Sequence, residues 1–471
     1  MPSDVDKEKD EKKKSKKSKL LHNQSPLSPV DGEEKNEIQL EEEIVHHCIP
    51  EDKTESEASN PLQTPELKST IKCNCGNPNC TLNAVIGWHE ESAEFEVIKR
   101  KYIIKKHQRQ KYKGSVCGKI VVAPGPDKLA VGGEFSAQMG VEVAYDKFVN
   151  HMPLERQTKD MKNAGLLVTV KTLYGLTEHI YNHLLPIPNM IRSEILSQPW
   201  LGIDESPMKF FNPKVAKGYV WSISNNYGAF YQFEPTRSGA VARELLKGYH
   251  GNVISDAYKG YDWLDKKTDV VHIYCWNHVR SNFFTAKGNY PKAGDIVLLI
   301  DDLFGIEHEA KSFEELKELR LDKSKKKIEE IEAAIDALAG KHLESSSIGT
   351  AISYFNCRRP RLKLFIDDPY IPLSNNGSEQ AQRDPVMGRN NFLYFRSING
   401  ADVGMLFYTL FGSCKRIGVN GKTYLLVQTI KAIRGEKLET PYQYGIRLRE
   451  EISKGVTQEL QTLKEQTPSS P

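Results

Sequence analysis

The chain has 471 residues, of which 39% are hydrophobic, so it is long enough for two or three domains with a substantial buried core. Its 65 basic and 62 acidic residues nearly cancel, so a nucleic-acid-binding role must rest on local patches and not on total charge. The N-terminal residues lack the apolar centre of a signal peptide, and no stretch approaches the roughly 20 apolar residues of a membrane span. Secretion and membrane insertion are not expected, which predicts a cytoplasmic protein.

The first 70 residues are predicted to be a disordered charged tail, because their Lys-, Glu- and Ser-rich composition buries too little apolar surface to offset the entropy of ordering. A small β-rich module is expected over residues 71–125. Within it, Glu94 to Ile104 has the pattern of a strand, and a basic run from Lys105 to Arg109 follows directly. Three of the eight cysteines crowd into Cys73–Cys80, which favours a metal site in a reducing compartment over a disulfide framework.

Residues 126–198 have helical periodicity. Two helices are predicted, Leu154 to Ala164 and Thr169 to Tyr181, separated by a break at Gly165. A helix, a glycine-containing turn and a second helix form the outline of a helix-turn-helix DNA reader. Ordinary helical hairpins share this outline, so both interpretations stay open.

Residues 199–435 are predicted to form a mixed α/β domain. A turn at Asn225-Asn226 and a helical stretch over Gly239–Tyr249 join three β-rich runs, which are Lys217–Ile223, Ala229–Phe233 and Asn252–Ser255. A helical insertion is expected over about 301–345. A last helical region from about 379 to 431 is expected to break near Pro385 and at Gly418–Gly421, and residues 436–471 are assigned to a C-terminal tail.

Two aspartates follow apolar runs of this domain. Asp204 follows Trp200 to Ile203 and Asp256 follows Val253 to Ser255, so each carboxylate is expected at or just past the end of a short strand, on one edge of a sheet. Glu379 is predicted in the first turn of a helix that begins after Ser374–Ser378, with Arg383 one turn further on. Carboxylates so grouped would suit Mg²⁺ or Mn²⁺. With 62 acidic residues in the chain, ordinary surface acids are the alternative.

The amino-acid sequence around these acids matches long motifs of a known family. The stretches WLGIDESPMKF, EPTRSGAVARELLKGYHGNVISDAYKGYDWL, YCWNHVRSNFF and LSNNGSEQAQRDPVMGRNNFLYFRSINGADVGMLFYTLFGSCKRIGVN resemble, in order, those of the insertion sequence 66 family of transposases. MPLERQTKDMKNAGLLVTVKTLYG resembles the family's helical DNA-binding segment, and the Cys73–Cys80 region its zinc-binding segment. The resemblance covers roughly residues 70–435.

This resemblance implies an α/β fold with a ribonuclease-H-like mixed sheet core and a helical insertion, preceded by a zinc-binding module and a helix-turn-helix-like segment. It implies that Asp204, Asp256 and Glu379 form a catalytic triad of DDE type that holds Mg²⁺ or Mn²⁺, with two ions expected. The aspartates are 52 positions apart, and Glu379 follows 123 positions after Asp256, which leaves room for the insertion.

Further residues map onto the family pattern. Arg237 and Ser238 match its Arg-Ser step, and Tyr258, Gly260 and Tyr261 follow the second aspartate; these are expected to shape the metal site or contact DNA. In the Cys-Trp-x-His-x-Arg signature from Cys275 to Arg280, His278 is expected to assist proton transfer or hold a phosphate, with a structural histidine beside a buried tryptophan as the alternative. Arg383 is a second candidate assisting residue. The candidate DNA-binding residues are Lys171, Arg237, Lys259, Arg280, Arg389 and Arg396.

The cysteine cluster departs from the family pattern. Cys73, Cys75 and Cys80 would supply three thiolates, and Cys117 the fourth ligand of a structural Zn²⁺. The family has two cysteine pairs, whereas here Gly114 stands where the first Cys of the second pair would be. A rearranged zinc site is expected, with His89 and His107 as substitute ligands; loss of zinc is the alternative.

The resulting hypothesis is a transposase that cuts DNA at the ends of a mobile element and joins the freed 3′-hydroxyl to target DNA, so it is expected at the nucleoid. The partners expected are double-stranded DNA, namely terminal inverted repeats and target, a second copy of the chain, and accessory proteins of the same element. Two alternatives remain open: a catalytically silent DNA-binding derivative, and a ribonuclease-H-like endonuclease without joining activity.

Overall fold

The computed structural model describes residues 71–72, 75, 77, 81–82, 100–130, 132–212, 215–393 and 395–466. The predicted tail over the first 70 residues lies outside these ranges. The chain divides into two compact units: Pro29–Lys101 is one, and the residues from Tyr102 onward belong to the other. In the first unit, β1 (Ile71–Lys72) and β2 (Thr81–Leu82) form a short antiparallel pair.

The second unit begins with an irregular segment and a β-hairpin. Arg100 to Ile104 is not in a strand, so the strand predicted over Glu94–Ile104 is wrong for the part that the structure describes. The hairpin consists of β3 (Lys111–Lys113) and β4 (Ile120–Val122). Its turn is closed by hydrogen bonds from Gly114 N to Lys119 O and from Gly118 N to Gly114 O, both 2.9 Å.

Four helices follow, as the helical periodicity predicts: α2 (Ala137–Phe148), α3 (Leu154–Asn163), α4 (Val170–Leu184) and α5 (Pro186–Leu196). The break between α3 and α4 falls at Gly165, whose φ of 86° is unfavourable for other residues. The Thr169 hydroxyl then caps α4 by accepting from Thr172 N at 3.1 Å. The predicted helix, glycine turn and helix are confirmed.

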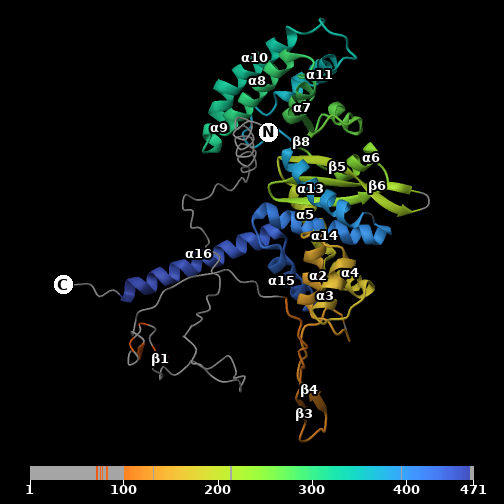
Figure 1. Cartoon of the computed structure of the whole chain (residues 1–471), viewed down its shortest axis with the longest axis vertical. Helices are drawn as coiled ribbons and strands as arrows, with labels where there is room; N and C mark the ends of the chain where they lie inside the picture. The colour runs from red at the N-terminus through yellow and green to blue at the C-terminus, as the bar shows by residue number, and fades with distance from the viewer. Residues whose placement is uncertain are drawn as a thin grey trace, which may run out of the picture. The chain divides into compact units, whose positions relative to one another are not determined.

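A five-stranded mixed sheet forms the centre of this unit (Figure 1). Its order is β7-β6-β5-β8-β9, in which β5, β6 and β7 are antiparallel and β5, β8 and β9 are parallel. The three predicted strands and the turn at Asn225-Asn226 are confirmed. The strands are β5 (Trp200–Asn212), β6 (Val215–Asn225), β7 (Gly228–Glu234), β8 (Asn252–Ser255) and β9 (Val271–Tyr274), with α6 (Gly239–Leu245) between β7 and β8.

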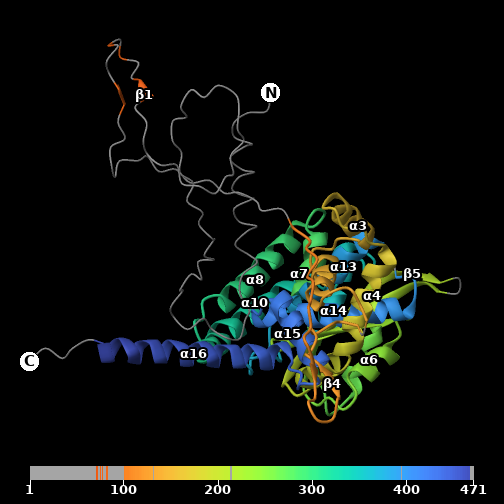
Figure 2. The ribbon, with the colours of Figure 1, turned by 90° about the horizontal axis from the view of Figure 1, so that it is seen from below.

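Each face of the sheet has its own apolar cluster. Neighbouring strand residues point to opposite faces, so Val253 and Ile254 of β8 mark the two sides. Val253 belongs to the cluster built from α2–α6 and the C-terminal helices, whereas Ile254 belongs to the cluster of the helical insertion. Figures 1 and 2 show the insertion gathered at one end of the sheet and α2–α4 at the other.

The insertion between β9 and the glutamate-bearing helix is longer than the predicted 301–345. A π-helical turn at Arg320–Ser324 interrupts it. Arg320 is buried there, pairs with Glu307 and donates to Phe365 O at 2.7 Å, which ties the insertion helices to the segment that leads back to the sheet. The helices are α7 (Trp276–Ala286), α8 (Pro291–Glu307), α9 (Phe313–Leu319), α10 (Lys325–Asp336), α11 (Ser347–Asn356) and α12 (Arg359–Leu362).

The predicted break near Pro385 does not occur, because α13 (Asn376–Phe392) runs through it. Proline cannot donate to the carbonyl of Ala381, but the Tyr231 hydroxyl donates to that oxygen at 2.7 Å instead. The next helix, α14 (Ile398–Ile417), lies along the edge strand β7, where its Ser413 hydroxyl bonds Ala229 N at 3.0 Å. This contact covers one edge of the sheet.

Three helices make up most of the described residues from 398 to 466. α14 ends at Gly418, which has φ 74°, and α15 (Gly421–Ile433) follows, so the predicted break at Gly418–Gly421 is confirmed. The segment assigned to a tail contains α16 (Pro441–Gln466), whose Tyr444 packs in the core. Among the described residues, the helices are all too short or too polar to span a membrane.

Candidate active site

Asp204 lies in the middle of β5, not at the end of a short strand as the sequence predicts. The antiparallel ladder with β6 continues past Asp204 to Asn212, whereas β8 pairs only with Trp200–Gly202. Asp204 therefore stands just beyond the point where its parallel neighbour stops. The sequence thus wrongly placed Asp204 at the end of its strand, but it correctly placed Asp204 near the edge of the sheet at which β8 ends.

Asp256 directly follows β8, as predicted. Gly202 pairs with Ile254, and Asp204 and Asp256 each come two residues later, so Asp256, just past the end of β8, lies on the same side of the sheet as Asp204. Its Oδ1 accepts a hydrogen bond from Tyr258 N at 2.9 Å, and Asp204 Oδ1 accepts one from Glu205 N at 2.9 Å. Both carboxylates are thus oriented by the backbone that follows them.

Glu379 reaches this edge because the start of α13 packs closely on β5. The Asn375 side chain donates to Ile203 O at 3.1 Å, and the Ser378 and Ser224 hydroxyls lie 3.0 Å apart. The approach requires glycine at position 202, since a Cβ there would lie 2.5 Å from Asn375 Oδ1 and closer still to the Ser378 hydroxyl. Glu379 is in the first turn of the helix, where a carboxylate is favoured by the helix dipole.

The charges of the neighbouring acids act on Asp204. Burial, then the negative charges of Glu205, Asp256 and Glu379, raise the pKa of Asp204 well above its usual range. Like charges close together in a poorly solvated place are unfavourable unless a cation balances them. The charges of Asp256 and Glu379 thus reach Asp204, but among the described residues the group whose ligand atoms lie close enough for one metal ion is Cys275, His278 and Glu379, and not the three acids.

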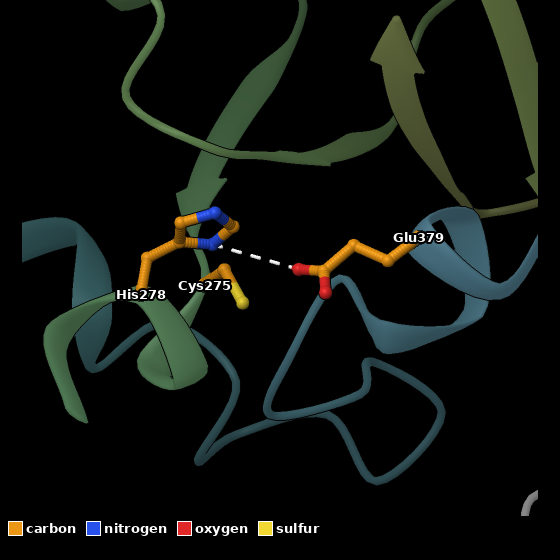
Figure 3. Close-up of side chains that lie close together, drawn as sticks. All are labelled: Cys275, His278 and Glu379. Carbon is orange, nitrogen blue, oxygen red and sulfur yellow. Dashed lines mark ion pairs between the residues drawn. The ribbon is translucent and has the colours of Figure 1, made fainter. Parts of the chain in front are cut away.

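Cys275 and His278 stand beside Glu379 (Figure 3). His278 Nδ1 lies 3.6 Å from Glu379 Oε1, and both atoms are buried without a hydrogen-bond partner among the described residues. The Cys275 Sγ, a His278 ring nitrogen and a Glu379 oxygen lie within 4.8 Å of one another. Burial raises the pKa of the Cys275 thiol to about 12, and its sulfur accepts a hydrogen bond from Asn375 N at 3.1 Å.

The residues of the Cys-Trp-x-His signature make two kinds of contact. The backbone N–H of Trp276 donates to Leu373 O at 3.2 Å, and the Trp276 indole donates to Leu362 O at 2.8 Å. Trp276 and Cys275 therefore fasten the start of α7 to the segment that precedes α13. His278 points toward Glu379 and not into the core (Figure 3).

Glu205 is a fourth carboxylate near this edge, and it is buried whereas Asp204, Asp256 and Glu379 are half-buried; the sequence analysis missed it. It points to the sheet face opposite Asp204, where it pairs with Arg237 at 2.6 Å and accepts from the Tyr261 hydroxyl. Arg237 also stacks on Tyr258, 4.0 Å from the ring centroid. Glu205 continues the period-two pattern of buried Leu201 and Ile203, and that alternation was the signal that could have found it.

The predicted DNA-binding cations fall into two groups. Arg280 forms a two-pronged ion pair with Asp301, Arg389 donates to Pro207 O, and Arg237 holds Glu205, so these three already have protein partners. The remaining candidates are exposed, as is the predicted assisting residue Arg383; the exposed cations are Lys171, Lys259, Arg383 and Arg396. A DNA-binding role for either group stays a prediction.

Two of the four predicted zinc ligands, Cys73 and Cys80, lie outside the described residues, as does His89. Cys75 and Cys117 are both exposed, and Cys117 is in the turn of the β3–β4 hairpin. A Cβ at Gly114 would lie 2.6 Å from Cys117 Sγ, so position 114 faces this sulfur but offers it no second ligand. Zinc binding stays a prediction, and the hairpin by itself has only part of a tetrahedral site.

Comparison with known protein families shows which family this chain belongs to. Residues 132–403 match the model of the family described as Transposase IS66 family. The chain belongs to this family. The matched region of this IS66 family member includes Asp204, Asp256, His278 and Glu379, and it begins after the β3–β4 hairpin.

Three relatives of this IS66 family member occur in Sinorhizobium fredii (strain NBRC 101917 / NGR234), and all three are named as uncharacterized proteins. The protein y4hP is 25% identical over 360 residues, which cover 70% of this chain and 65% of y4hP. The protein y4qI is 24% identical over 73% of this chain and 68% of its own length, and y4jD is 22% identical over 68% of each. The chain thus spans slightly less than two thirds of y4hP.

Proposed function

We propose that this chain is a metal-dependent DNA strand-transfer enzyme whose catalytic carboxylates are Asp204, Asp256 and Glu379. The observation that carries the proposal is the half-buried carboxyl of Asp204, whose pKa is raised by desolvation and by its acidic neighbours. A group of this kind in a place where three acids converge is typical of a functional site. Membership of the transposase family and the β7-β6-β5-β8-β9 order, which fits a ribonuclease-H-like core, both support it.

The donor set fits hard divalent cations. Carboxylate oxygens are the ligands that Mg²⁺ and Mn²⁺ prefer, and Glu379 Oε1 has no hydrogen-bond partner among the described residues. Asp204, Asp256 and Glu379 would hold the metal, with His278 adjacent. When bound, a pair of such ions would help to activate the attacking oxygen and to stabilise the leaving oxygen of a phosphodiester.

The reaction would proceed in two displacements at phosphorus. Water attacks a phosphodiester at the end of the mobile element, the P–O3′ bond breaks, and a 3′-hydroxyl is released. That hydroxyl then attacks a phosphodiester of the target DNA and displaces its 3′-oxygen, so no covalent enzyme intermediate is needed. Within this scheme the Asn375 contact keeps α13 against β5, and Glu205 with Arg237 and Tyr261 holds the opposite side of the Asp204 backbone.

The direct test is a strand-transfer assay with labelled element-end duplex, target DNA and Mg²⁺ or Mn²⁺. Asp204→Asn, Asp256→Asn and Glu379→Gln are each expected to abolish both cleavage and joining, while Glu318→Gln, at an exposed site in the insertion, should leave them unchanged. Full activity in any one of the three variants would overturn the assignment. Cleavage without joining by the unaltered chain would point to an endonuclease instead.

A further inference from the structure

Cys275, His278 and Glu379 bring three different types of metal ligand together, and we call them the mixed cluster (Figure 3). One ligand atom from each residue lies within 4.8 Å of the other two. His278 Nδ1 and Glu379 Oε1 are 3.6 Å apart and buried, yet neither atom has a hydrogen-bond partner in the part of the chain that the structure describes. Buried polar atoms that face each other without hydrogen bonds are unfavourable unless a third group, such as a cation, binds both.

The orientation of Glu379 separates the mixed cluster from the three acids. Figure 3 shows the Glu379 carboxylate directed toward His278 and Cys275. Of the acids that raise the pKa of Asp204, Glu379 has the smallest effect, after Glu205 and Asp256. The Glu379 side chain is 37% exposed, so it has room to rotate. Glu379 must therefore turn away from the mixed cluster before it can share a metal ion with the two aspartates.

The backbone around Cys275 suits a metal-bound thiolate. Cys275 directly precedes α7, so its sulfur stands at the N-terminus of an 11-residue helix, where negative charge is favoured. Asn375 N donates to the sulfur at 3.1 Å, and the backbone N–H groups of Asn277 and His278 also donate to it. Donors of this kind orient and stabilise a sulfur ligand. The Asn375 side chain also holds α13 against β5, so one residue positions both the sulfur and the helix of Glu379.

The ligand types decide which metal suits the mixed cluster. Zn²⁺ binds thiolate, imidazole and carboxylate at about 2.0–2.3 Å, and it accepts three protein ligands with a fourth position left to water. Mg²⁺ prefers oxygen ligands alone. We propose that Cys275, His278 and Glu379 form a Zn²⁺ site, separate from the zinc predicted within residues 73–117. On binding, the Cys275 thiol releases its proton to solvent, and His278 binds as the neutral imidazole.

The zinc site has a regulatory consequence, because Glu379 belongs to it and also to the proposed Mg²⁺ site. Zn²⁺ in the mixed cluster keeps Glu379 turned away from Asp204 and Asp256, so it removes one of the three carboxylates that strand transfer needs. Zinc is thus an inhibitor that acts through Glu379. Only this consequence rests on the proposed function, since the zinc site itself is defined by its own three ligands.

The first experiment measures the zinc content of the full chain after dialysis against micromolar free Zn²⁺. The Cys275→Ser protein should hold one ion fewer per chain than the unaltered protein. The matched control is Cys357→Ser, which changes an exposed cysteine just after α11 and should hold as much zinc as the unaltered protein. Zinc bound within residues 73–117 contributes equally to all three proteins, so it cancels in the comparison.

Two further measurements separate the mixed cluster from the N-terminal cysteines directly. The Cys117→Ser/Cys275→Ser protein should hold one zinc ion fewer than the Cys117→Ser protein. In a chain whose four N-terminal cysteines are all changed to serine, added Co²⁺ should still give a sulfur-to-cobalt absorption band, and Cys275→Ser should abolish that band. The four cysteines are Cys73, Cys75, Cys80 and Cys117.

Two variants repeat the test if Cys275→Ser does not fold. The side chains of His278 and Glu379 are 35% and 37% exposed, so replacing them disturbs the core less than replacing the buried sulfur. His278→Ala and Glu379→Gln each remove one of three ligands and should weaken zinc binding by about a hundredfold or more. Urea unfolding of each metal-free variant checks that the chain is folded.

The second experiment measures Mg²⁺-dependent strand transfer with and without micromolar Zn²⁺. The rate of the unaltered chain should fall in proportion to the share of chains that hold zinc in the mixed cluster. The Cys275→Ser protein is compared with its own rate in the absence of zinc, and that rate should be unchanged on adding zinc.

Equal zinc contents in the unaltered and Cys275→Ser proteins would overturn the inference and leave His278 and Glu379 as a simple ion pair. Strand transfer that continues while the mixed cluster holds zinc would refute the shared use of Glu379. If the chain binds zinc at the mixed cluster but never joins DNA with Mg²⁺, the proposed function fails while the zinc site stands.

Discussion

Gly202→Ala tests most directly the position of α13, the helix that carries the proposed catalytic residue Glu379. Gly202 lies on β5, two residues before Asp204, and the start of α13 rests on its bare backbone. A Cβ at this position would lie 2.5 Å from Asn375 Oδ1, whereas ordinary contacts begin near 3.4 Å. The start of α13, and Glu379 with it, must therefore move away from Asp204 by about 1 Å.

The expected effect on activity exceeds the effect on stability. A displacement of about 1 Å in a catalytic group lowers the rate of strand transfer roughly a hundredfold. Overpacking by one methyl group costs about 1–3 kcal/mol of the free energy of unfolding, which a chain of this size can tolerate. The variant should thus remain folded and lose most of its activity.

The assay compares metal-dependent strand transfer with urea unfolding for the same samples. Ser378→Gly, combined with Gly202→Ala, removes the hydroxyl that the new methyl group approaches most closely and should restore part of the activity. Strand transfer by Gly202→Ala within twofold of the unaltered chain, at unchanged stability, would refute the close packing of α13 on β5 as the determinant of the site.

Three other predictions concern charge and burial. The raised pKa of Asp204 means that the folded state binds the proton of this carboxyl more tightly than the unfolded chain does, so the metal-free Asp204→Asn protein should be more stable than the unaltered chain at neutral pH. In urea unfolding, this gain in stability should shrink as the pH falls toward 3.8. A gain that grew on acidification would contradict the prediction. Arg320→Leu leaves Glu307 buried and unpaired, so it should lower the free energy of unfolding by about 3–5 kcal/mol in the same urea experiment, and adding Glu307→Leu should restore much of this loss. A loss below about 1 kcal/mol would count against the buried ion pair. Hydrogen bonding to Arg447 lowers the pKa of Glu439 to about 2, so the ionised Glu439 stabilises the folded chain above pH 4.5, and this stabilisation is lost as the pH falls through about 2. The Glu439→Gln protein should therefore be less stable than the unaltered chain at pH 7 and equally stable near pH 2. A difference in stability that does not change with pH would argue against the ion pair.

Several parts of the fold were predicted from local sequence. The α3–Gly165–α4 hairpin, β8 and the break at Gly418 were found because periodicity, capping residues and glycine act over a few residues. The central α/β sheet was predicted for the same reason. The three acids, however, were ordinary by spacing alone, and only the longer motifs around them set them apart.

Tertiary contacts decided the rest. β5 continues past Asp204 because β6 pairs with it, and α13 passes Pro385 because Tyr231, some 150 residues earlier, supplies the missing hydrogen bond. The partners of Arg280 and the burial of Glu205 are likewise made by residues distant in sequence. Thus the sequence by itself singled out the three carboxylates of the proposed site, whereas only the folded structure decided how the segments that carry them are held, because the groups that hold these segments come together only when the chain packs.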